Sequence, residues 1–398
     1  MEKCVIKKIL DKICSRVDAN AKRFDGRIPG DSTDADGKYL LNVGGGWTDS
    51  FFVGMLNLAF AYTEDDEYMT YCKGYSSYFS KRAENDEQWC EENGIIPLDH
   101  DTGFLFMLSE VYRYKLTGDE SAKDTALLAA DKLAKRFNDK GGFIRAWDTW
   151  KWDTDEEFIN DKKGKIIADS MMNLSLLFWA WKETGNERFY NIAVTHANTV
   201  MKYIVRPDGS SFHQYNFNPE TGEPKRGCTG QGYADDSCWS RGQAWLIYGF
   251  TQCYRYTDDE RYLDTAVKTA KFFIDNICVN GLVPWDFSCK DFGVRPYDSS
   301  ACAIALSGMI SLNSICPSKS VEDAIYKLYK GIMTQCSALD IDGWESVLLH
   351  ACGGPAYSAG KENIIINPRI DCPMMYGDYY FFEALLKLYD DKYIDFIY

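Results

Sequence analysis

This chain repeats one local pattern: a helix that is apolar on almost every side, a tight turn, and a helix with one apolar face. Residues 166–190 (IIADSMMNLSLLFWAWKETGNERFY) show it most clearly, because the run from Met171 to Trp181 is broken only by Asn173 and Ser175. A helix of this kind belongs inside a protein rather than on its surface. Similar stretches begin at five other positions: Trp47, His100, Trp239, Tyr297 and Tyr376. Helix pairs repeated in this way predict a stacked array or a closed ring.

The two ends of the chain favour the ring. An amphipathic helix is expected at about residues 2–20 with no buried helix before it, and the last buried helix, at about 378–389, has no surface helix after it. The first helix can therefore be the outer partner of the last, whereas an open array would need polar capping repeats. The other outer helices are expected at 66–84, 120–137, 187–204, 260–277 and 320–336. The sequence thus predicts an all-α (α/α)6 toroid of six inner and six outer helices, and, without a linker-like stretch, a single domain over residues 1–398.

Long connections precede the inner helices, so all of them open onto one face of the ring, at the N-terminal ends of those helices. They cover residues 21–46, 85–99, 138–167, 205–238, 278–296 and 337–376. Connections of this length are usually functional. Many tryptophans lie in or beside them: Trp47, Trp89, Trp147, Trp150, Trp152, Trp239, Trp285 and Trp344. Their rings suit the apolar faces of sugars, although each could instead anchor its loop by packing.

Composition narrows the choice of partner. The formal charge of −15 argues against nucleic acid or an anionic membrane surface, although a local Arg or Lys can still bind a small anion. No stretch has the length of a membrane span, and the first 17 residues do not read as a signal peptide. The fourteen cysteines include no CxxC pair, which disfavours structural zinc. We therefore expect reduced thiols, with a few disulfides still possible, in a cytoplasmic monomer or weak homodimer.

Aspartates stand where five of the inner helices are expected to begin: Asp49, Asp101, Asp169, Asp298 and Asp378. Asp is a preferred N-cap and complements the positive end of the helix dipole, so capping alone explains the repetition. Capping or structural support is our interpretation of the last two. Several carboxylates at one mouth also suit acid–base chemistry on a glycan, but the residues alone do not identify the catalytic pair.

Six motifs, in order along nearly the whole chain, resemble the unsaturated glucuronyl hydrolases of glycoside hydrolase family 88. They are WTDSFF (47–52), HDTGFLF (100–106), ADSMMNLSLLFWA (168–180), GQGYADDSCWSRGQAWLIYGF (230–250), DSSACAIA (298–305) and GDYYFFEAL (377–385). The 230–250 run and the motifs that begin at 100 and 168 are the specific ones. The resemblance implies an (α/α)6 barrel, in agreement with the helix count. It also implies a hydrolase that releases a 4,5-unsaturated uronic acid from the non-reducing end of lyase-generated, glycosaminoglycan-type oligosaccharides.

The chemistry implied by this resemblance is hydration of a C4=C5 vinyl ether. An aspartic acid protonates C4, water adds at C5, and the resulting hemiketal opens and expels the aglycone. By motif match, Asp169 is the general acid/base and Asp101 its partner carboxylate; no metal and no organic cofactor is implied. Two nearby carboxylates raise each other's pKa, which keeps one of them protonated near neutrality.

The same motif match implies the residues that bind the sugar. Arg241 and Gln231 would bind the uronate carboxylate, since Arg offers a two-pronged donor, although Arg241 could instead pair with Asp235 or Asp236. The other sugar-binding residues implied are Trp47, His100, His213, Trp239 and Trp245. Trp245 could equally be part of the core, and the two histidines could be hydrogen-bonded loop residues.

The chain departs from the family pattern at two places. Gly230 stands where the family often has His, immediately before the Gln of the GQGY run. Residues 353–376 look longer than the family's counterpart, and members that accept sulfated disaccharides use Ser and Lys near this point. Ser358 and Lys361 are therefore candidate substrate-binding residues, but Ala356 and Ala359 stand where further serines are expected. The preferred disaccharide, its linkage and the tolerance for sulfate stay open.

Two other functions compete with this hypothesis. A sugar epimerase on the same toroid would place a pair of His residues on inner helices, and none of the four His residues is expected there. A non-catalytic glycan-binding or regulatory protein would have no need of both Asp101 and Asp169.

Overall fold

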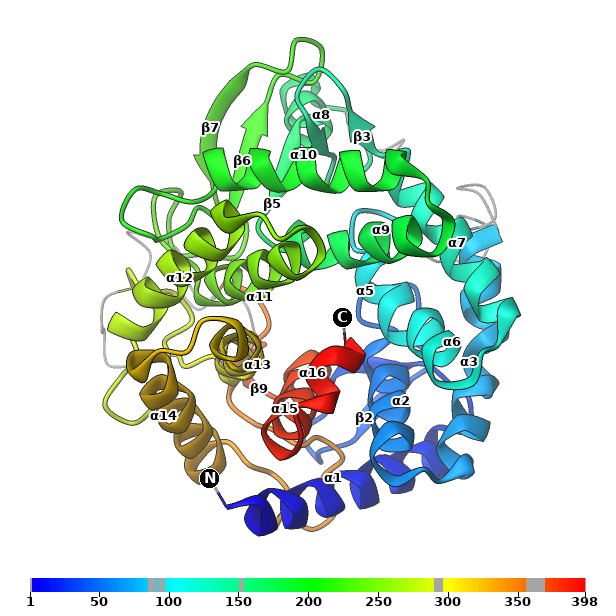
Figure 1. Ribbon diagram of the computed structural model, residues 1–398. Coiled ribbons are helices and arrows are strands. Elements are labelled where there is room, and N and C mark those ends of the chain that lie inside the picture. The colour runs from blue at the N-terminus through cyan, green and yellow to red at the C-terminus, as the bar shows by residue number, and fades with distance from the viewer. Residues whose placement is uncertain are drawn as a thin grey trace.

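The computed structural model describes residues 2–84, 90, 92, 97–149, 154–289, 296–355 and 369–397, and its helices form two concentric rings (Figure 1). The inner ring contains α2 (Phe51–Thr63), α5 (Thr102–Phe106) with η1 (Met107–Val111) and α6 (Tyr112–Thr117), α9 (Ser170–Thr184), α11 (Ser240–Thr257), α13 (Ser299–Ile315) and α15 (Met375–Tyr389). The outer ring contains α1 (Lys3–Phe24), α3 (Asp66–Glu84), α7 (Glu120–Ala134), α10 (Glu187–Tyr203), α12 (Glu260–Asp275) and α14 (Lys319–Gln335). Because α1 packs against α15 and α2, the ring closes. The predicted (α/α)6 toroid is confirmed.

The difference between inner and outer helices follows from their sequences. In α9 every residue from Ser170 to Ala180 is buried, as an apolar helix at the centre of the protein requires. In α10 the buried residues, among them Phe189, Ile192, Ala193 and Val200, recur at the spacing of one helix face. The inner helices therefore form the core, and the outer helices cover it with one apolar face each.

The tight turns between inner and outer helices repeat a three-residue design. Gly185 adopts a left-handed φ of 68° and closes α9 through a hydrogen bond from its N–H to Trp181 O. Asn186 then caps α10, because its side chain accepts a hydrogen bond from Arg188 N. Residues 117–119 (TGD) and 257–259 (TDD) make the same turn with Asp as the cap. The turn and the apolar helix before it form the repeat seen in the sequence.

Strands are limited to short antiparallel pairs in the connections. They are β1 (Pro29–Thr33) with β2 (Tyr39–Leu41), β3 (Phe137–Asn138) with β4 (Phe143–Ile144), and β8 (Ala351–Cys352) with β9 (Ile370–Cys372). A three-stranded sheet joins two connections: β5 (Lys165–Ile167), β6 (Gln214–Phe217) and β7 (Pro224–Cys228). This sheet leads directly into α9, since Ala168 N donates to His213 O at 2.9 Å.

Three helical features were not predicted. The second inner helix contains the π-helical segment η1 between α5 and α6. A short helix, α16 (Lys392–Ile397), follows α15, so the expectation that nothing helical follows the last inner helix is wrong. It lies at the ends of inner helices opposite the connections: Tyr393 Oη donates to Ala61 O at 3.4 Å, and Lys115 Nζ donates to Phe396 O at 3.1 Å. A further short helix, α8 (Glu156–Lys163), lies in the connection before α9.

A buried polar network lies in the middle of the inner ring. Lys387 Nζ is 2.9 Å from Glu383 Oε1, and both side chains are almost fully buried. The Glu383 carboxylate also accepts hydrogen bonds from Tyr248 Oη and Tyr379 Oη, both at 2.7 Å, and from Ser307 Oγ. Because Tyr248 lies on α11, Ser307 on α13 and the ion pair on α15, the network joins these three helices. Removing one partner of the ion pair would leave the other as an unpaired buried charge.

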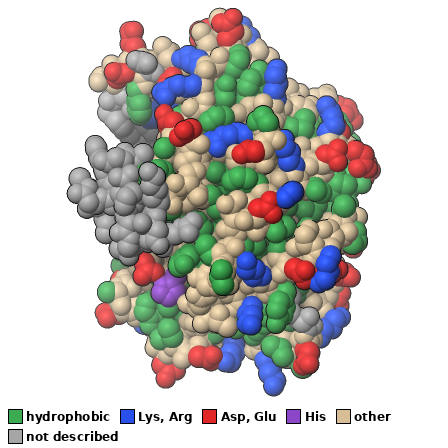
Figure 2. All heavy atoms as spheres, turned by 90° about the vertical axis from the view of Figure 1, so that its left-hand side faces the viewer, with side chains coloured by type: hydrophobic (Ala, Val, Ile, Leu, Met, Phe, Trp, Pro, Cys, Tyr) green, Lys and Arg blue, Asp and Glu red, His purple; other side chains and the backbone are tan. Residues whose placement is uncertain are grey.

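The structure bears on three expectations from composition: the distribution of surface charge, the state of the cysteines and the absence of a membrane span. Figure 2 shows Lys and Arg interspersed with Asp and Glu over one face, so the charge of −15 is not gathered into one patch on the described part of that face. All fourteen cysteines are free thiols, as expected for a reduced protein. None of the described helices combines the length and apolar composition that crossing a bilayer requires.

Asp298 and Asp378 both have the structural roles expected of them, in different ways. The Asp298 carboxylate caps α13 by accepting from Ser300 N and Ala301 N. Asp378 lies in the first turn of α15, three residues after the helix begins, so the predicted start of this helix is wrong. Its carboxylate instead accepts from Val347 N, Leu348 N and Tyr39 Oη, which fastens a connection and β2 to the inner ring.

We predict that Asp378→Asn destabilises the fold. An amide in this position turns an NH2 group toward one of the three donors, and an unsatisfied buried donor costs about 1–3 kcal/mol. The melting temperature should therefore fall, while Asp391→Asn, a change at an exposed residue just after the other end of the same helix, should leave it unchanged. Equal melting temperatures for Asp378→Asn and wild type would mean that these three hydrogen bonds add nothing to stability.

Candidate active site

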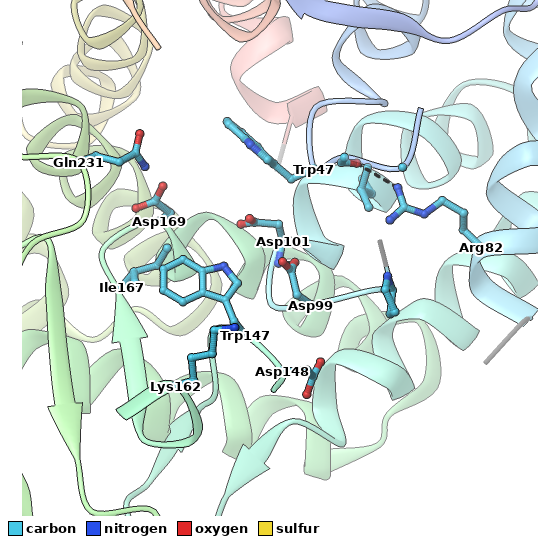
Figure 3. A pocket seen from close by; sticks show the side chains of 14 residues that line it. Trp47, Arg82, Asp99, Asp101, Trp147, Asp148, Lys162, Ile167, Asp169 and Gln231 are labelled. Carbon is cyan, nitrogen blue, oxygen red and sulfur yellow. Dashed lines mark hydrogen bonds between the residues drawn. The ribbon is translucent and has the colours of Figure 1, made fainter. Parts of the chain in front are cut away.

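A cavity of about 420 Å³ opens at the N-terminal ends of α5 and α9. It is lined by Gly45, Gly46, Trp47, Arg82, Pro97, Asp99, Asp101, Leu105, Trp147, Asp148, Lys162, Ile167, Asp169 and Gln231. Figure 3 shows Asp169 and Asp101 in the same part of the pocket, with Trp47 and Trp147 on opposite sides of them. The cavity is therefore at the predicted end of the ring, and it brings together four of the predicted site residues: Trp47, Asp101, Asp169 and Gln231.

Asp169 is held at the start of α9 without using its carboxylate. It occupies the N-cap position, but its side chain makes no capping hydrogen bond. Its Oδ2 is buried and accepts no hydrogen bond from any described residue. Burial raises the pKa of Asp169 to about 6, while the charge of Arg241 and the indole N–H of Trp245 oppose part of that rise. Trp245 Nε1 still has no hydrogen bond of ordinary geometry. A carboxyl group with this pKa can hold a proton and release it near neutrality.

Asp101 occupies the N-cap position of α5, and it too makes no capping hydrogen bond with its side chain. Its Oδ1 accepts from Asn173 Nδ2 at 3.2 Å, and its backbone N–H donates to Asp99 Oδ1 at 2.8 Å. Burial raises the pKa of Asp101 well above its usual range, and the nearby charges of Asp99 and Asp169 raise it further. The expected mutual influence of two carboxylates is present, and the pair retains a proton near neutrality.

Capping does not explain either of these aspartates. A cap must accept a hydrogen bond from a backbone N–H in the first turn of its helix, as Asp298 does. Neither Asp101 nor Asp169 accepts such a bond. A carboxylate that stabilises no helix end and is buried at a cost in desolvation indicates a functional role.

The other carboxylates near the cavity have cationic neighbours. Asp148 pairs with Arg136 at 2.6 Å and with Arg145. Asp49, just behind the cavity, pairs with Arg82 at 3.0 Å. It also accepts hydrogen bonds from Tyr78 Oη and Gly45 N, so it supports the loop rather than capping α2. Among the described residues no Arg or Lys forms an ion pair with Asp101, Asp169 or the neighbouring Asp99, which separates these three from Asp148 and Asp49.

Arg241 forms an ion pair with Asp298, at 2.7 Å between Nη1 and Oδ2. The alternative partners considered from the sequence, Asp235 and Asp236, are therefore wrong, and Asp235 instead accepts from Arg226 at 3.3 Å. Nη1 of Arg241 also donates to the backbone O of residue 352, and Nη2 donates to Gln231 Oε1 at 2.8 Å. The guanidinium is buried, and its link to the cavity wall runs through Gln231.

The two site histidines are buried and neutral, but they are not fully hydrogen-bonded. His213 Nδ1 accepts from Gly230 N at 3.0 Å and Gln231 N at 3.2 Å, which places the proton of the neutral ring on Nε2. Burial lowers the pKa of His213 to about 3, and its Nε2 has no partner among the described residues. His100 is also buried with its pKa lowered by burial; its Nε2 lies 3.5 Å from Asp101 Oδ2. Both histidines therefore retain hydrogen-bonding capacity.

The tryptophans divide into wall and core. Trp47 lines the cavity and stacks on Tyr376 with ring centroids 5.1 Å apart. Trp239 and Trp245 are fully buried. The ring centroids of Trp245 and Phe104 are 5.2 Å apart, so Trp245 is a core residue, which was the alternative considered for it from the sequence. The sequence did not single out Trp147, Lys162, Arg82 or Asp99. Of these four residues, only Trp147 had a signal in the sequence: it was one of the tryptophans in the long connections that could stack on a sugar. Ser358 and Lys361 lie outside the described residues.

Asp99, His100 and Asp101 each offer a ligand atom within 4.8 Å of the others, the closest approach to a cation site in the described part of the chain. Their chemistry is poorly suited to a resident metal. Asp101 Oδ1 already accepts from Asn173, and the positive charge of Arg136 acts on Asp99, His100 and Asp101. We therefore assign no metal to this group.

Comparison with known proteins gives one consistent result. Residues 20–364 match the model of Glycosyl Hydrolase Family 88. An unsaturated chondroitin disaccharide hydrolase of Streptococcus pneumoniae (strain ATCC BAA-255 / R6) is 32% identical over 388 residues, 96% of this chain and 91% of the relative. An unsaturated glucuronyl hydrolase of Bacillus sp. (strain GL1) is 35% identical over 379 residues, 93% of each chain. The crystal structure of the unsaturated glucuronyl hydrolase of Bacillus sp. GL1, responsible for the degradation of glycosaminoglycan, superposes with a TM-score of 0.84 at 32% identity, covering 96% of both chains.

The ion pair changes what is expected of Arg241→Ala. The substitution leaves the Asp298 carboxylate buried without its cation, which costs about 3–5 kcal/mol. We predict a clear fall in melting temperature for Arg241→Ala. Arg226→Ala, which removes an exposed pair, should change it little. A melting temperature equal to that of wild type would show that Asp298 does not depend on Arg241.

Proposed function

This chain belongs to glycosyl hydrolase family 88, and from that membership we propose that it removes a 4,5-unsaturated uronic acid from the non-reducing end of lyase-generated glycosaminoglycan oligosaccharides. The names of its relatives and the (α/α)6 ring support this substrate class. The single observation that carries the chemistry is the pair Asp169 and Asp101: two buried carboxylates in one cavity, with raised pKa values and no Arg or Lys among the described residues in an ion pair with either.

The proposed reaction is hydration of the C4=C5 vinyl ether. Protonated Asp169 gives its proton to C4, and positive charge develops at C5, where the ring oxygen shares it. Water adds to C5 and returns a proton to the Asp169 carboxylate, so the catalyst is regenerated. The hemiketal at C5 then opens to a ketone, which leaves a hemiacetal at C1. Collapse of that hemiacetal to an aldehyde breaks the bond from C1 to the glycosidic oxygen and expels the rest of the oligosaccharide as an alcohol. Asp101 is the partner carboxylate: its coupling to Asp169 lets the pair retain a proton near neutrality.

The cavity offers matching groups for the rest of the sugar. Its volume of about 420 Å³ lies within the usual range of small-molecule sites. Trp47 and Trp147 present aromatic faces on opposite sides. Gln231, backed by Arg241, and the Nε2–H of His213 are the donors proposed for the uronate carboxylate. Lys162 adds a cation to the cavity lining that an anionic oligosaccharide would favour.

The remaining features of the chain fit this role. We infer that residues 1–398 act as one domain, as a monomer or weak homodimer. Fourteen free thiols suit a reducing compartment, so we propose a cytoplasmic site of action. His196 lies on the outer helix α10, and the other three histidines lie outside the described helices, which removes the feature expected of an epimerase.

The direct test uses an unsaturated chondroitin or hyaluronan disaccharide. Its double bond, conjugated with the carboxylate, absorbs in the ultraviolet, and hydration destroys that absorbance. We expect loss of absorbance together with release of one reducing sugar per double bond lost, in the presence of EDTA, since no metal is proposed. Binding of the disaccharide without loss of absorbance would instead support the glycan-binding protein considered above.

We predict that Asp169→Asn abolishes most turnover and leaves the fold unchanged. Asn cannot transfer a proton, and loss of general acid–base catalysis costs about 10²–10⁴ in rate. The Asp169 side chain makes no capping bond, so the melting temperatures of Asp169→Asn and Asp169→Ala should both stay near that of wild type. Turnover by Asp169→Asn above about a tenth of the wild-type rate would overturn the assignment.

The pKa of about 6 predicts the pH dependence of the wild-type enzyme. Asp169 must be protonated to act as the acid, and the protonated fraction falls tenfold per pH unit above its pKa. The value of kcat/KM should therefore decline as pH rises through about 6, reversibly on return to lower pH. A value of kcat/KM that instead increases from pH 6 to 8 would mean that Asp169 acts first as a base.

A further inference from the structure

Two cations line the described part of the cavity, Arg82 and Lys162. Arg82 is buried and engaged by the protein, because its Nη1 lies 3.0 Å from Asp49 Oδ2 and donates to Gly46 O at 3.0 Å. It therefore supports the loop that leads into α2. The cation whose role is not explained by such a loop is Lys162, in the last turn of the short helix α8.

α8 is fastened to the three-stranded sheet, so its last turn has a fixed place. Asp155 caps the start of the helix by accepting from Phe158 N at 2.7 Å. Near the end of the helix, Asp161 Oδ2 accepts from Asn216 Nδ2 at 2.8 Å, and Asp161 Oδ1 accepts from Lys225 Nζ at 3.3 Å. Asn216 lies on β6 and Lys225 on β7, so α8 is held against both strands.

The chain leaves α8 at Gly164, where the backbone of β6 leaves no room for a side chain. A Cβ added to Gly164 would lie 1.9 Å from Phe217 O, and Phe217 N donates to Gly164 O at 2.8 Å. β5 begins at the next residue and leads to Asp169. Since a strand rises about 3.3 Å per residue, β5 separates the end of α8 from the start of α9 by about 10 Å. The sheet therefore fixes both Lys162 and Asp169, at separate places on the lining.

The residues around Lys162 show that its side chain is the one α8 directs to the cavity. Asp161 faces the sheet and Lys163 is exposed, whereas Lys162 is half-buried and lines the cavity. Phe158, one turn earlier, supports the ammonium, since Nζ lies 4.9 Å from the centroid of the Phe158 ring. Both lysines suit the negative end of the helix dipole, so the dipole does not explain why one of them lines the cavity.

The place of Lys162 indicates which part of a substrate it meets. Figure 3 shows Asp169 between Gln231 and Lys162. Gln231 is a donor proposed for the uronate carboxylate, so Lys162 lies on the other side of the proposed proton donor, where the next sugar extends. In a glycosaminoglycan the sugar next to a uronate is a hexosamine, and its anionic groups are sulfates. An ammonium has three donors, so it can contact a protein group and a sulfate together.

We propose that Lys162 is a specificity-determining residue: its ammonium binds a sulfate group on the sugar that the reaction expels. The proposal rests on the function proposed above, because it concerns the same cavity. Since the lining also contains four aspartates, a sulfated sugar gains from a cation at its own position. Recognition of sulfate is thereby placed on α8, a different stretch of the chain from Ser358 and Lys361, the candidates that the sequence suggested.

The test compares sulfated with unsulfated unsaturated chondroitin disaccharides, as the ratio of their kcat/KM values. Lys162→Gln removes the charge, so this ratio should fall about tenfold, the effect of losing a hydrogen bond between charged groups. Disaccharides sulfated at O4 and at O6 are both measured, and a fall with either one supports the proposal. A ratio that stays at its wild-type value with both, even where kcat/KM falls for every substrate, would overturn it.

Lys163→Gln is the matched control. It removes the same charge from the same turn of α8, but at an exposed side chain outside the described cavity lining, so the ratio should not change. Lys361→Gln tests the lysine that the sequence suggested. If Lys163→Gln lowers the ratio as much as Lys162→Gln, the effect comes from the overall charge. If Lys361→Gln lowers it and Lys162→Gln does not, sulfate is bound elsewhere. Either result contradicts the proposal.

A measurement of binding without turnover keeps this proposal apart from the proposed function. Calorimetry on Asp169→Asn, with and without Lys162→Gln, gives the Kd of each disaccharide. Replacing Lys162 should weaken binding of the sulfated disaccharide about tenfold more than that of the unsulfated one. A wild-type protein that never consumes the double bond would refute the proposed function. The role of Lys162 is refuted if both disaccharides lose affinity equally, or if the sulfated one does not bind.

Discussion

The architecture depends on burying helices on all sides, which also buries their ends. The first four N–H groups of each helix have no partner within the helix, so they must be satisfied by other groups or by water. The structure meets this requirement with side chains and connections gathered at one mouth of the ring. Asp298 caps α13 directly, whereas Asp378 fastens a connection over α15. Polar groups concentrated at this mouth are thus a requirement of the fold. A catalytic site needs only that two of the carboxylates there make no capping hydrogen bond, as is true of Asp101 and Asp169.

Charges around the cavity divide into those that are neutralised locally and those that are not. Arg241 with Asp298 and Arg82 with Asp49 are buried pairs whose members offset each other. Asp101 and Asp169 form no ion pair with a described Arg or Lys, so burial outweighs their other neighbours and raises the pKa of each. The same low-polarity surroundings that would destabilise a lone carboxylate make it useful as an acid near neutrality. The neutral histidines beside them add donors without adding a charge.

The sequence predicted those features that depend on residues close together in the chain. Inner and outer helices differ in how many of their faces are apolar, and turns such as residues 184–186 have a local signature, so the ring followed from them. The pairing of Arg241 with Asp298 did not, because it joins two neighbouring inner helices and no local pattern encodes which carboxylate will be nearest. The π-helical segment η1 and the buried pair of Glu383 and Lys387 were missed for the same reason. The candidate catalytic aspartates were chosen by resemblance, because aspartates at the expected starts of five inner helices could not be told apart by sequence. The structure distinguishes Asp298, which caps its helix, from Asp101 and Asp169, whose carboxylates make no capping bond.

The helix α16 and the network around Glu383 decide how a long substrate can approach. Ile397 of α16 lines a cavity of only about 20 Å³ together with Tyr248, Tyr380 and Glu383, and Figure 1 shows α16 over the middle of the ring, so the described side chains leave little open space there. The toroid is therefore a blind pit and not a tunnel. A polymer cannot thread through it and slide to the next cleavage point; it can only insert its terminus, lose one sugar and withdraw. Such an enzyme is exo-acting by architecture, and its output depends on how many chain ends an upstream lyase creates.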